Sequence, residues 1–512
     1  MTLTAAPNTS VAIDRAAFGD LAATPETLLT TTDHRKIGGM LASAALLVGV
    51  AGTVLTGLVA VKLDDAVRGE LAESGFLGAS SAGGWSFARL WSAAQNGLPM
   101  FVIAPLFLAL ATMAVPGLIG SNRLAFPRLQ AFVLWGYVSA MALYIAAFTV
   151  VDGPPSWSTA GSSDLVNGPA NHATDLFAGA LGVVAIVLFA GAVNIVATVL
   201  TQRQPGLQLE DVAPFAWASL LASAISIISL PVFLAGLLMT ALNVHVTGNL
   251  ATAPGFDLIW QHSVFLFGRP DVVVPVLGAL GVAAQIVSNR AGRPLIGGVA
   301  SKALMAVFAA LSLALWATSN ITAVVQPTPT LISGLLAVPA GLLALIFLGT
   351  LAQGLKPNAS LVSVLAILLL LALGAVNVIV AAARGIETDL GGIWTIGQTL
   401  LLLVAVPLVG ALAGLHEFAP VAWGRKAMEP LAGLAALAAL GGGVLLGLGI
   451  AGIAYKNNVA DNGTAASVVA GIGAFLLAGA IALTALNLLG SVLARKGQPV
   501  EDSIGVLTEG EA

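Results

Sequence analysis

The chain of 512 residues lacks cysteine altogether and contains few histidines, tyrosines and charged residues. Without cysteine it can form no disulfide, no thiolate metal site and no nucleophilic thiol. Only 9% of its residues are charged, whereas a soluble domain carries about 25%. Its net charge of −4 is small and does not indicate a nucleic-acid partner. The charges are too few to cover a globular surface, so we expect a membrane to solvate most of the chain.

Apolar residues are abundant: they make up 58% of the chain, and the mean hydropathy is +0.97. A membrane-spanning helix needs about 20 mainly apolar residues. The predicted fold is therefore all-α and polytopic, with twelve transmembrane helices in one membrane domain (31–496) between a soluble tail (1–30) and an acidic tail (497–512). The predicted spans are 37–61, 97–119, 129–151, 175–201, 214–243, 258–286, 299–325, 331–353, 360–383, 393–415, 430–454 and 466–494.

Lysine and arginine predict the orientation, because they concentrate on the cytoplasmic side of membrane proteins. With the N-terminus inside and the spans alternating, fourteen of these residues lie in inner segments and five in outer segments. The remaining one, Arg269, lies within an apolar run. This pattern predicts an even number of spans and two cytoplasmic termini.

Five sequence motifs, in order and with matching spacing, resemble subunit I of the haem-copper oxidases, the cytochrome c oxidase family. The resemblance covers about residues 31 to 496 and implies the twelve-helix bundle of that family. The motifs are "TTDHRKIG" (31–38), "VPGLIGSNRLAFPRLQAFVLW" (115–135), "RQPGLQLEDVAPFAW" (203–217), "WQHSVFLFGRPDVVV" (260–274) and "LAVPAGL" (336–342).

The family's haem ligands do not carry over to this sequence. The resemblance implies one histidine on the second helix and two on the tenth, which together hold two haems. The matching positions are Ala94, Thr399 and Leu401, and the predicted tenth helix contains no histidine. Loss of all three ligands predicts a bundle without haem.

The family's copper site and proton channels are altered in the same way. Arg269, Thr318 and Ser319 stand where the resemblance implies three copper-binding histidines. Val273 replaces the cross-linked tyrosine, and a deep glutamate is kept as the shorter Asp271. We therefore predict that copper is absent as well. At the two proton channels, the altered positions are Arg123 and Leu343.

A count of histidines gives the same prediction without an alignment. Haem and copper require imidazole or sulfur ligands, and the family's two centres use six imidazoles. This chain has five histidines, and only one of them lies within a predicted span. They are His34, His172, His245, His262 and His416.

Arg269 is costly at membrane depth unless it has a partner or a hydrated cavity. One hypothesis is a buried ion pair with Asp271, or polar contacts to Thr318 and Ser319, in the emptied copper site. A second hypothesis is a hydrated arginine near the outer end of its helix. A third is an arginine that helps to move protons or ions, although its high pKa makes it a poor proton carrier.

Three functional hypotheses stay open. The first is a non-catalytic scaffold or assembly subunit of a respiratory complex in the bacterial plasma membrane, with side chains or lipid filling the haem pockets. The second is an active terminal oxidase, which passes electrons from cytochrome c or quinol to oxygen. The third is a proton or ion pathway protein. The expected partners are subunit II- or III-like membrane proteins, lipid, and a cytochrome c-type protein at the outer loop that carries Asp152 and Asp164.

Overall fold

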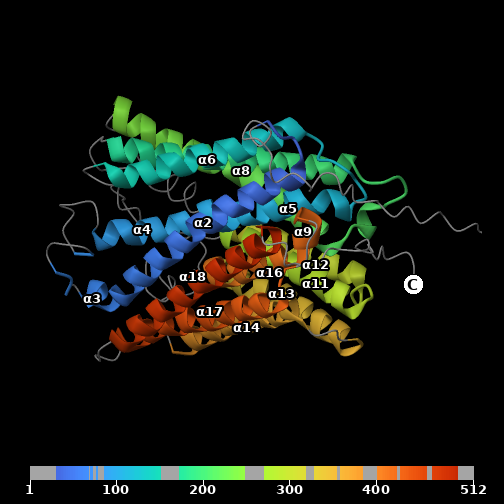
Figure 1. The fold of residues 1–512 in the computed structure, drawn as a ribbon. Helices are drawn as coiled ribbons and strands as arrows, with labels where there is room; N and C mark the ends of the chain where they lie inside the picture. Colours follow the sequence, from blue (N-terminus) through green and yellow to red (C-terminus); the bar gives the residue numbers. More distant parts are fainter. Residues whose placement is uncertain are drawn as a thin grey trace, which may run out of the picture.

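A computed structural model describes residues 30–68, 70–72, 77–78, 86–150, 172–247, 270–318, 328–354, 358–384, 400–423, 427–457 and 464–493. All the regular structure in these segments is helical (Figure 1). The helices are α2 (His34–Val61), α3 (Leu63–Arg68), α4 (Phe87–Leu98), η2 (Pro99–Ile103), α5 (Ala104–Leu118), α6 (Pro127–Thr149), α8 (His172–Thr201), η3 (Leu209–Asp211), α9 (Pro214–Leu242), η4 (Asn243–Thr247), α11 (Pro270–Ala291), α12 (Gly298–Thr318), α13 (Thr328–Ala352), α14 (Ala359–Arg384), η7 (Leu400–Ala405), α16 (Val406–Trp423), α17 (Glu429–Asn457) and α18 (Thr464–Leu493).

Each of the twelve predicted runs overlaps one of these helices. Nine helices in the described segments are long and apolar enough to cross a membrane. The described apolar parts of α12 and α16, Gly298–Ala314 and Val406–Phe418, are shorter. A multi-pass membrane protein is therefore confirmed, whereas the number twelve stays a prediction.

Two helical segments lie wholly or mainly in the link between the first two predicted spans. These are α3 and α4. The second predicted span thus has a helical extension on its N-terminal side, since α4 continues through η2 into α5.

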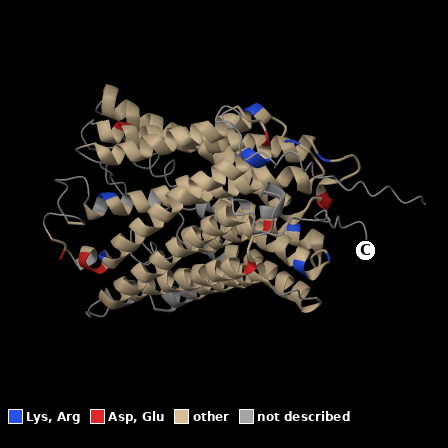
Figure 2. Ribbon diagram, in the orientation of Figure 1, with Lys and Arg blue, Asp and Glu red and all other residues tan. Residues whose placement is uncertain are grey.

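The helices form an elongated bundle in which neighbours in sequence often pack together. The closest pairs are α17 with α18 and α6 with α8, while α2 packs on both α18 and α5 (Figure 1). Charged residues gather towards the two ends of the bundle and leave its middle largely free of them (Figure 2). This distribution fits an apolar slab between two polar surfaces. The direction in which the termini face stays a prediction.

Helix α2 begins within the motif at residues 31–38, three residues before the predicted span 37–61. Asp33 is the N-cap residue of α2, and its Oδ1 accepts a hydrogen bond of 2.9 Å from the backbone N–H of Arg35. Thr31 Oγ1 in turn accepts one of 3.2 Å from the N–H of Asp33. The motif at residues 31–38 therefore starts a helix.

We expect Asp33→Ala to lower the free energy of unfolding by about 0.5–2 kcal/mol, the usual cost of losing an N-cap side chain. Chemical denaturation in detergent micelles measures this loss. Thr32→Ala is the control, since Thr32 is exposed beside the cap. Equal effects of the two substitutions would contradict the capping role.

The motif at residues 203–217 ties the connection before α9 to the start of α12. Trp217 Nε1 donates a 3.0 Å hydrogen bond to the carbonyl oxygen of Lys302. Lys302 Nζ donates in return to the carbonyl oxygen of Glu210. These reciprocal bonds fix helices that are far apart in sequence at one end of the bundle.

Candidate functional site

Two of the three positions that the resemblance matches to haem ligands lie in described segments, and both are buried. Ala94 of α4 is 2% exposed, and Leu401 of η7 is 0% exposed. Both helices contain a π-helical segment close to these positions: η2 begins at Pro99, and η7 includes Leu401 itself. The two π-helical segments contact each other. Segments of this kind are frequent at functional sites.

Leu401, and Leu98 one turn after Ala94, pack closely against neighbouring helices. A Cβ atom placed on Gly447 of α17 would lie 2.9 Å from Leu401 Cδ1. A Cβ atom on Gly52 of α2 would likewise lie 2.9 Å from Leu98 Cδ2. Because glycine has no side chain, each of these leucines can extend up to the facing helix. Leu401 and Leu98 therefore fill the space between the helices.

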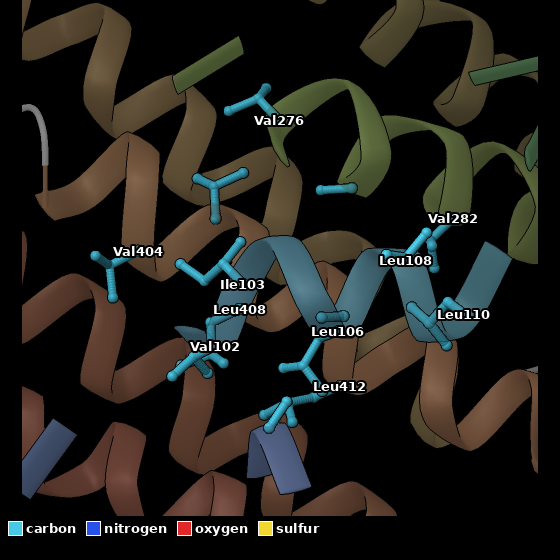
Figure 3. Close-up of a cluster of buried hydrophobic side chains, with 14 of the residues drawn as sticks. Val102, Ile103, Leu106, Leu108, Leu110, Val276, Val282, Val404, Leu408 and Leu412 are labelled. Carbon is cyan, nitrogen blue, oxygen red and sulfur yellow. The ribbon is translucent and has the colours of Figure 1, made fainter. Parts of the chain in front are cut away.

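The centre of the bundle is filled by aliphatic side chains from η2, α5, α11, η7 and α16 (Figure 3). Val102, Val404 and Leu408 are each at most 2% exposed. A glycine of α16 also faces a leucine of α5: a Cβ atom on Gly414 would lie 2.7 Å from Leu110 Cδ1. Close-packed hydrocarbon of this kind is expensive to displace.

Ala94 and Leu401 do not fit haem. Haem iron in proteins is held by imidazole, thiolate, thioether or phenolate, whereas these residues offer only a methyl and an isobutyl group. The two channel positions are also described. Leu343 of α13 is 0% exposed, and Arg123 is exposed in the turn between α5 and α6.

The predicted copper site falls largely outside the described residues. Arg269, Ser319 and Thr399 are not described at all. For Asp271 and Val273 in the first turns of α11, and for Thr318 at the end of α12, only the helical backbone is described. The ion pair between Arg269 and Asp271 therefore stays a prediction.

The described histidines lie on four different elements. His34 and His172 begin α2 and α8, and His416 lies in α16. His245 Nε2 is 2.7 Å from Asp175 Oδ1, and both side chains are 45% exposed. His262 is outside the described residues. Within the described segments, no three His, Cys, Asp or Glu side chains are grouped so that they could hold a metal ion.

A buried polar cluster joins α5, α6 and α8 near Arg123. Gln130 Nε2 donates to Thr112 Oγ1 at 2.8 Å, and Asn194 Nδ2 donates to Gln130 Oε1 at 3.0 Å. Asn194 Oδ1 also accepts from the backbone N–H of Phe126 at 3.0 Å. Thr112, Gln130 and Asn194 are 0% exposed. Asn194 thus belongs to a bonded cluster that fixes the motif at residues 115–135.

Thr112→Val is expected to destabilise the protein by about 1–3 kcal/mol, because Gln130 Nε2 would lose its partner while buried. Thermal unfolding of the purified protein reports the loss. Thr201→Val removes an exposed hydroxyl of α8 that bonds within its own helix and serves as the control. If the two variants unfolded at the same temperature, the cluster would have no stabilising role.

A cavity of about 100 Å³ lies between α5, α8, α9 and α11. Its wall is mainly apolar and includes Phe107 of α5 and Leu188 of α8. Ser219, Ser223 and Ser226 of α9 supply hydroxyl groups to it. The sequence gives no signal for this cavity, since its lining comes from four separate helices.

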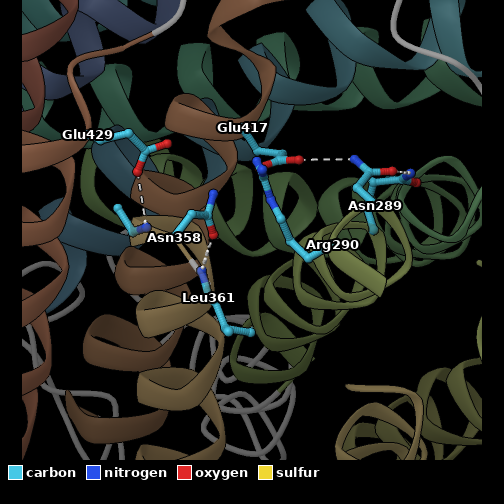
Figure 4. A network of polar contacts seen from close by, with 8 residues as sticks. Asn289, Arg290, Asn358, Leu361, Glu417 and Glu429 are labelled. Atoms are coloured by element: carbon cyan, nitrogen blue, oxygen red, sulfur yellow. Dashed lines mark hydrogen bonds and ion pairs between the residues drawn. The ribbon is translucent and has the colours of Figure 1, made fainter. Parts of the chain in front are cut away.

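Sequence reasoning also missed an ion pair between α11 and α16. Arg290 Nη2 is 2.7 Å from Glu417 Oε2, and Asn289 Nδ2 donates to Glu417 Oε1 at 3.0 Å (Figure 4). Glu417 is largely buried, with a side chain that is 6% exposed. A single glutamate inside an apolar helix was the available signal, because a carboxylate at such a position needs a partner.

The helical bundle, with its apolar middle and polar ends, defines a multi-pass membrane protein. A family model described as "Cytochrome C and Quinol oxidase polypeptide I" matches residues 36–456. The chain therefore belongs to the family of haem-copper oxidase subunit I, and the resemblance of its motifs to that family is confirmed.

Known relatives are similar to this chain at low identity. The probable cytochrome c oxidase subunit 1-beta of Nocardia farcinica is 27% identical over 334 residues, which cover 64% of this chain and 55% of the relative. The putative subunit 1-beta of Streptomyces coelicolor is 27% identical over 335 residues, covering 64% and 56%. Cytochrome c oxidase subunit 1 of Corynebacterium glutamicum is 26% identical over 335 residues, covering 64% and 55%. The chain thus matches about half the length of these relatives.

Proposed function

We propose that this protein is a haem- and copper-free form of oxidase subunit I, which serves as a scaffold or assembly subunit of a respiratory membrane complex. The observation that carries the proposal is the pair of positions Ala94 and Leu401. Both are buried hydrocarbon where the family has ligands for one haem, and Leu401 packs against Gly447. Neither Ala94 nor Leu401 can bind the iron of a haem placed between them.

The replacements at the other metal and channel positions support the same proposal. Arg269, Thr318 and Ser319 lack the imidazoles that copper prefers. Thr399 likewise cannot supply the second haem with an imidazole. An active oxidase would need a different set of ligands for every one of these centres.

The proposed setting is the bacterial plasma membrane, with both termini in the cytoplasm. The described helices expose large aliphatic side chains, among them Leu335, Val338 and Leu345 on α13. Lipid or the apolar helices of other subunits would cover such surfaces. We propose subunit II- or III-like proteins as those partners.

Affinity purification in a mild detergent, followed by an oxygen-consumption assay, tests this function. We expect other membrane subunits to co-purify in a fixed ratio. We also expect the isolated chain to consume no oxygen when supplied with reduced cytochrome c or quinol. Oxygen reduction by the isolated chain would instead support the alternative of an active terminal oxidase.

A further inference from the structure

The end of α11 carries a row of polar side chains that leads from the protein surface into the bundle. Arg290 pairs with Glu417 of α16, and Asn289 bonds to the same carboxylate (Figure 4). One turn further in, Gln285 Nε2 donates a 3.1 Å hydrogen bond to Asn289 Oδ1. The groups thus form one continuous hydrogen-bonded chain between two helices.

Within this row of polar side chains on α11, two buried atoms have no hydrogen-bond partner among the described residues. They are Gln285 Oε1 and Arg290 Nε. Gln285 is only 7% exposed. Native proteins leave few buried polar atoms unpaired, because each such atom loses its bonds to solvent without replacement. Internal water is the usual partner of such atoms.

The row of polar side chains runs from the partly exposed Arg290 to the buried Gln285, which gives a small molecule a polar route inwards. The Arg290 side chain is 31% exposed, whereas that of Glu417 is 6% exposed. Gln285 lies five residues before Arg290, which is about 7.5 Å along a helix. Further along α11, Val282 and Leu280 are apolar and 0% exposed, so the polar row ends at Gln285.

The unpaired atoms also limit what the molecule can be. A molecule beside Gln285 Oε1 must donate a hydrogen bond to it, and a molecule beside Arg290 Nε must accept one. The opposite charges of Arg290 and Glu417 offset each other, so neither a cation nor an anion is favoured. Water can both donate and accept a hydrogen bond, and it is the smallest molecule that can do so.

We infer that α11 and α16 enclose a water-binding inlet, which opens beside Arg290 and ends at Gln285. The inlet brings solvent to the buried carboxylate of Glu417 and does not cross the bundle. This inference is independent of the proposed scaffold function, since it involves none of the haem, copper or channel positions.

The absence of native cysteine allows a direct test by thiol labelling. The full chain with Gln285→Cys, held in lipid nanodiscs, is treated with a small water-soluble methanethiosulfonate reagent. Only a hydrated thiol forms the reactive thiolate readily, so we expect labelling at least about tenfold faster than for Ala283→Cys. Ala283 is the matched control, because it is 0% exposed on the same helix.

Asn122→Cys, at an exposed position between α5 and α6, sets the rate for full solvent contact. Equal labelling rates for the Gln285→Cys and Ala283→Cys variants would overturn the inference. A cryo-electron microscopy map of the wild-type chain that resolves waters provides a second test, which does not depend on the folding of any variant. Density within hydrogen-bonding distance of Gln285 Oε1 is expected, and dry, well-ordered surroundings of that atom would refute the inlet.

Discussion

Gly449→Leu is expected to prevent the close packing of α17 on α18. A Cβ atom at Gly449 would lie 2.7 Å from both the carbonyl oxygen of Ala466 and the Cα of Ala470. These are backbone atoms, so no side chain can rotate away to make room. The expected loss of stability is at or above the roughly 1–3 kcal/mol typical of overpacking. Little folded protein should remain in the membrane, which size-exclusion chromatography of detergent extracts measures.

Gly433→Leu is the matched control for this prediction. Gly433 lies on the same helix, but a Cβ atom there would meet nothing within 4 Å. The Gly433→Leu variant should therefore elute as the wild-type protein does. Similar behaviour of the two leucine variants would mean that the contact between α17 and α18 does not hold the bundle together.

Leu401→Ala is expected to lower the free energy of unfolding by about 2–5 kcal/mol, the range seen when a buried leucine is truncated. Leu401 is 0% exposed and fills the space beside Gly447. The shortened side chain would leave a cavity at the position where catalytic relatives are expected to place a haem ligand. Denaturant titration of the purified protein measures the cost.

Leu448→Ala provides the comparison, because Leu448 lies on α17 next to Gly447 and is 47% exposed. Truncation there should change stability far less. A negligible effect of Leu401→Ala would indicate that Leu401 borders an open pocket instead of filling one. The proposal that aliphatic side chains have replaced haem would then lose its main support.

Much of the fold was predictable because a membrane restricts the possible structures. A spanning helix requires a long apolar run, and each run predicted in the sequence overlaps a helix in the described segments. Some helix ends also depend on groups that are close in sequence, as for Asp33 at the start of α2. The π-helical segments η2 and η7 gave no comparable signal in the sequence.

The sequence gives the types of residue at the candidate site but not how their side chains pack. The types of residue at positions 94 and 401 already predicted the loss of ligands. The contact between Leu401 and Gly447 depends on how two separate helices are positioned along each other. A single sequence does not give that register. The bond between Asn289 and Glu417 joins residues 128 positions apart, so only the folded bundle brings them together.

The most direct test of the central claim is the haem and copper content of the purified full chain, separated from its partners. An absorption spectrum, pyridine haemochrome analysis and elemental analysis provide these values. We predict no Soret band and no copper beyond trace amounts, since Ala94 and Leu401 offer iron no ligand. One haem or one copper bound per chain would contradict the account and direct attention to other ligands, beginning with His262 and the eight methionines.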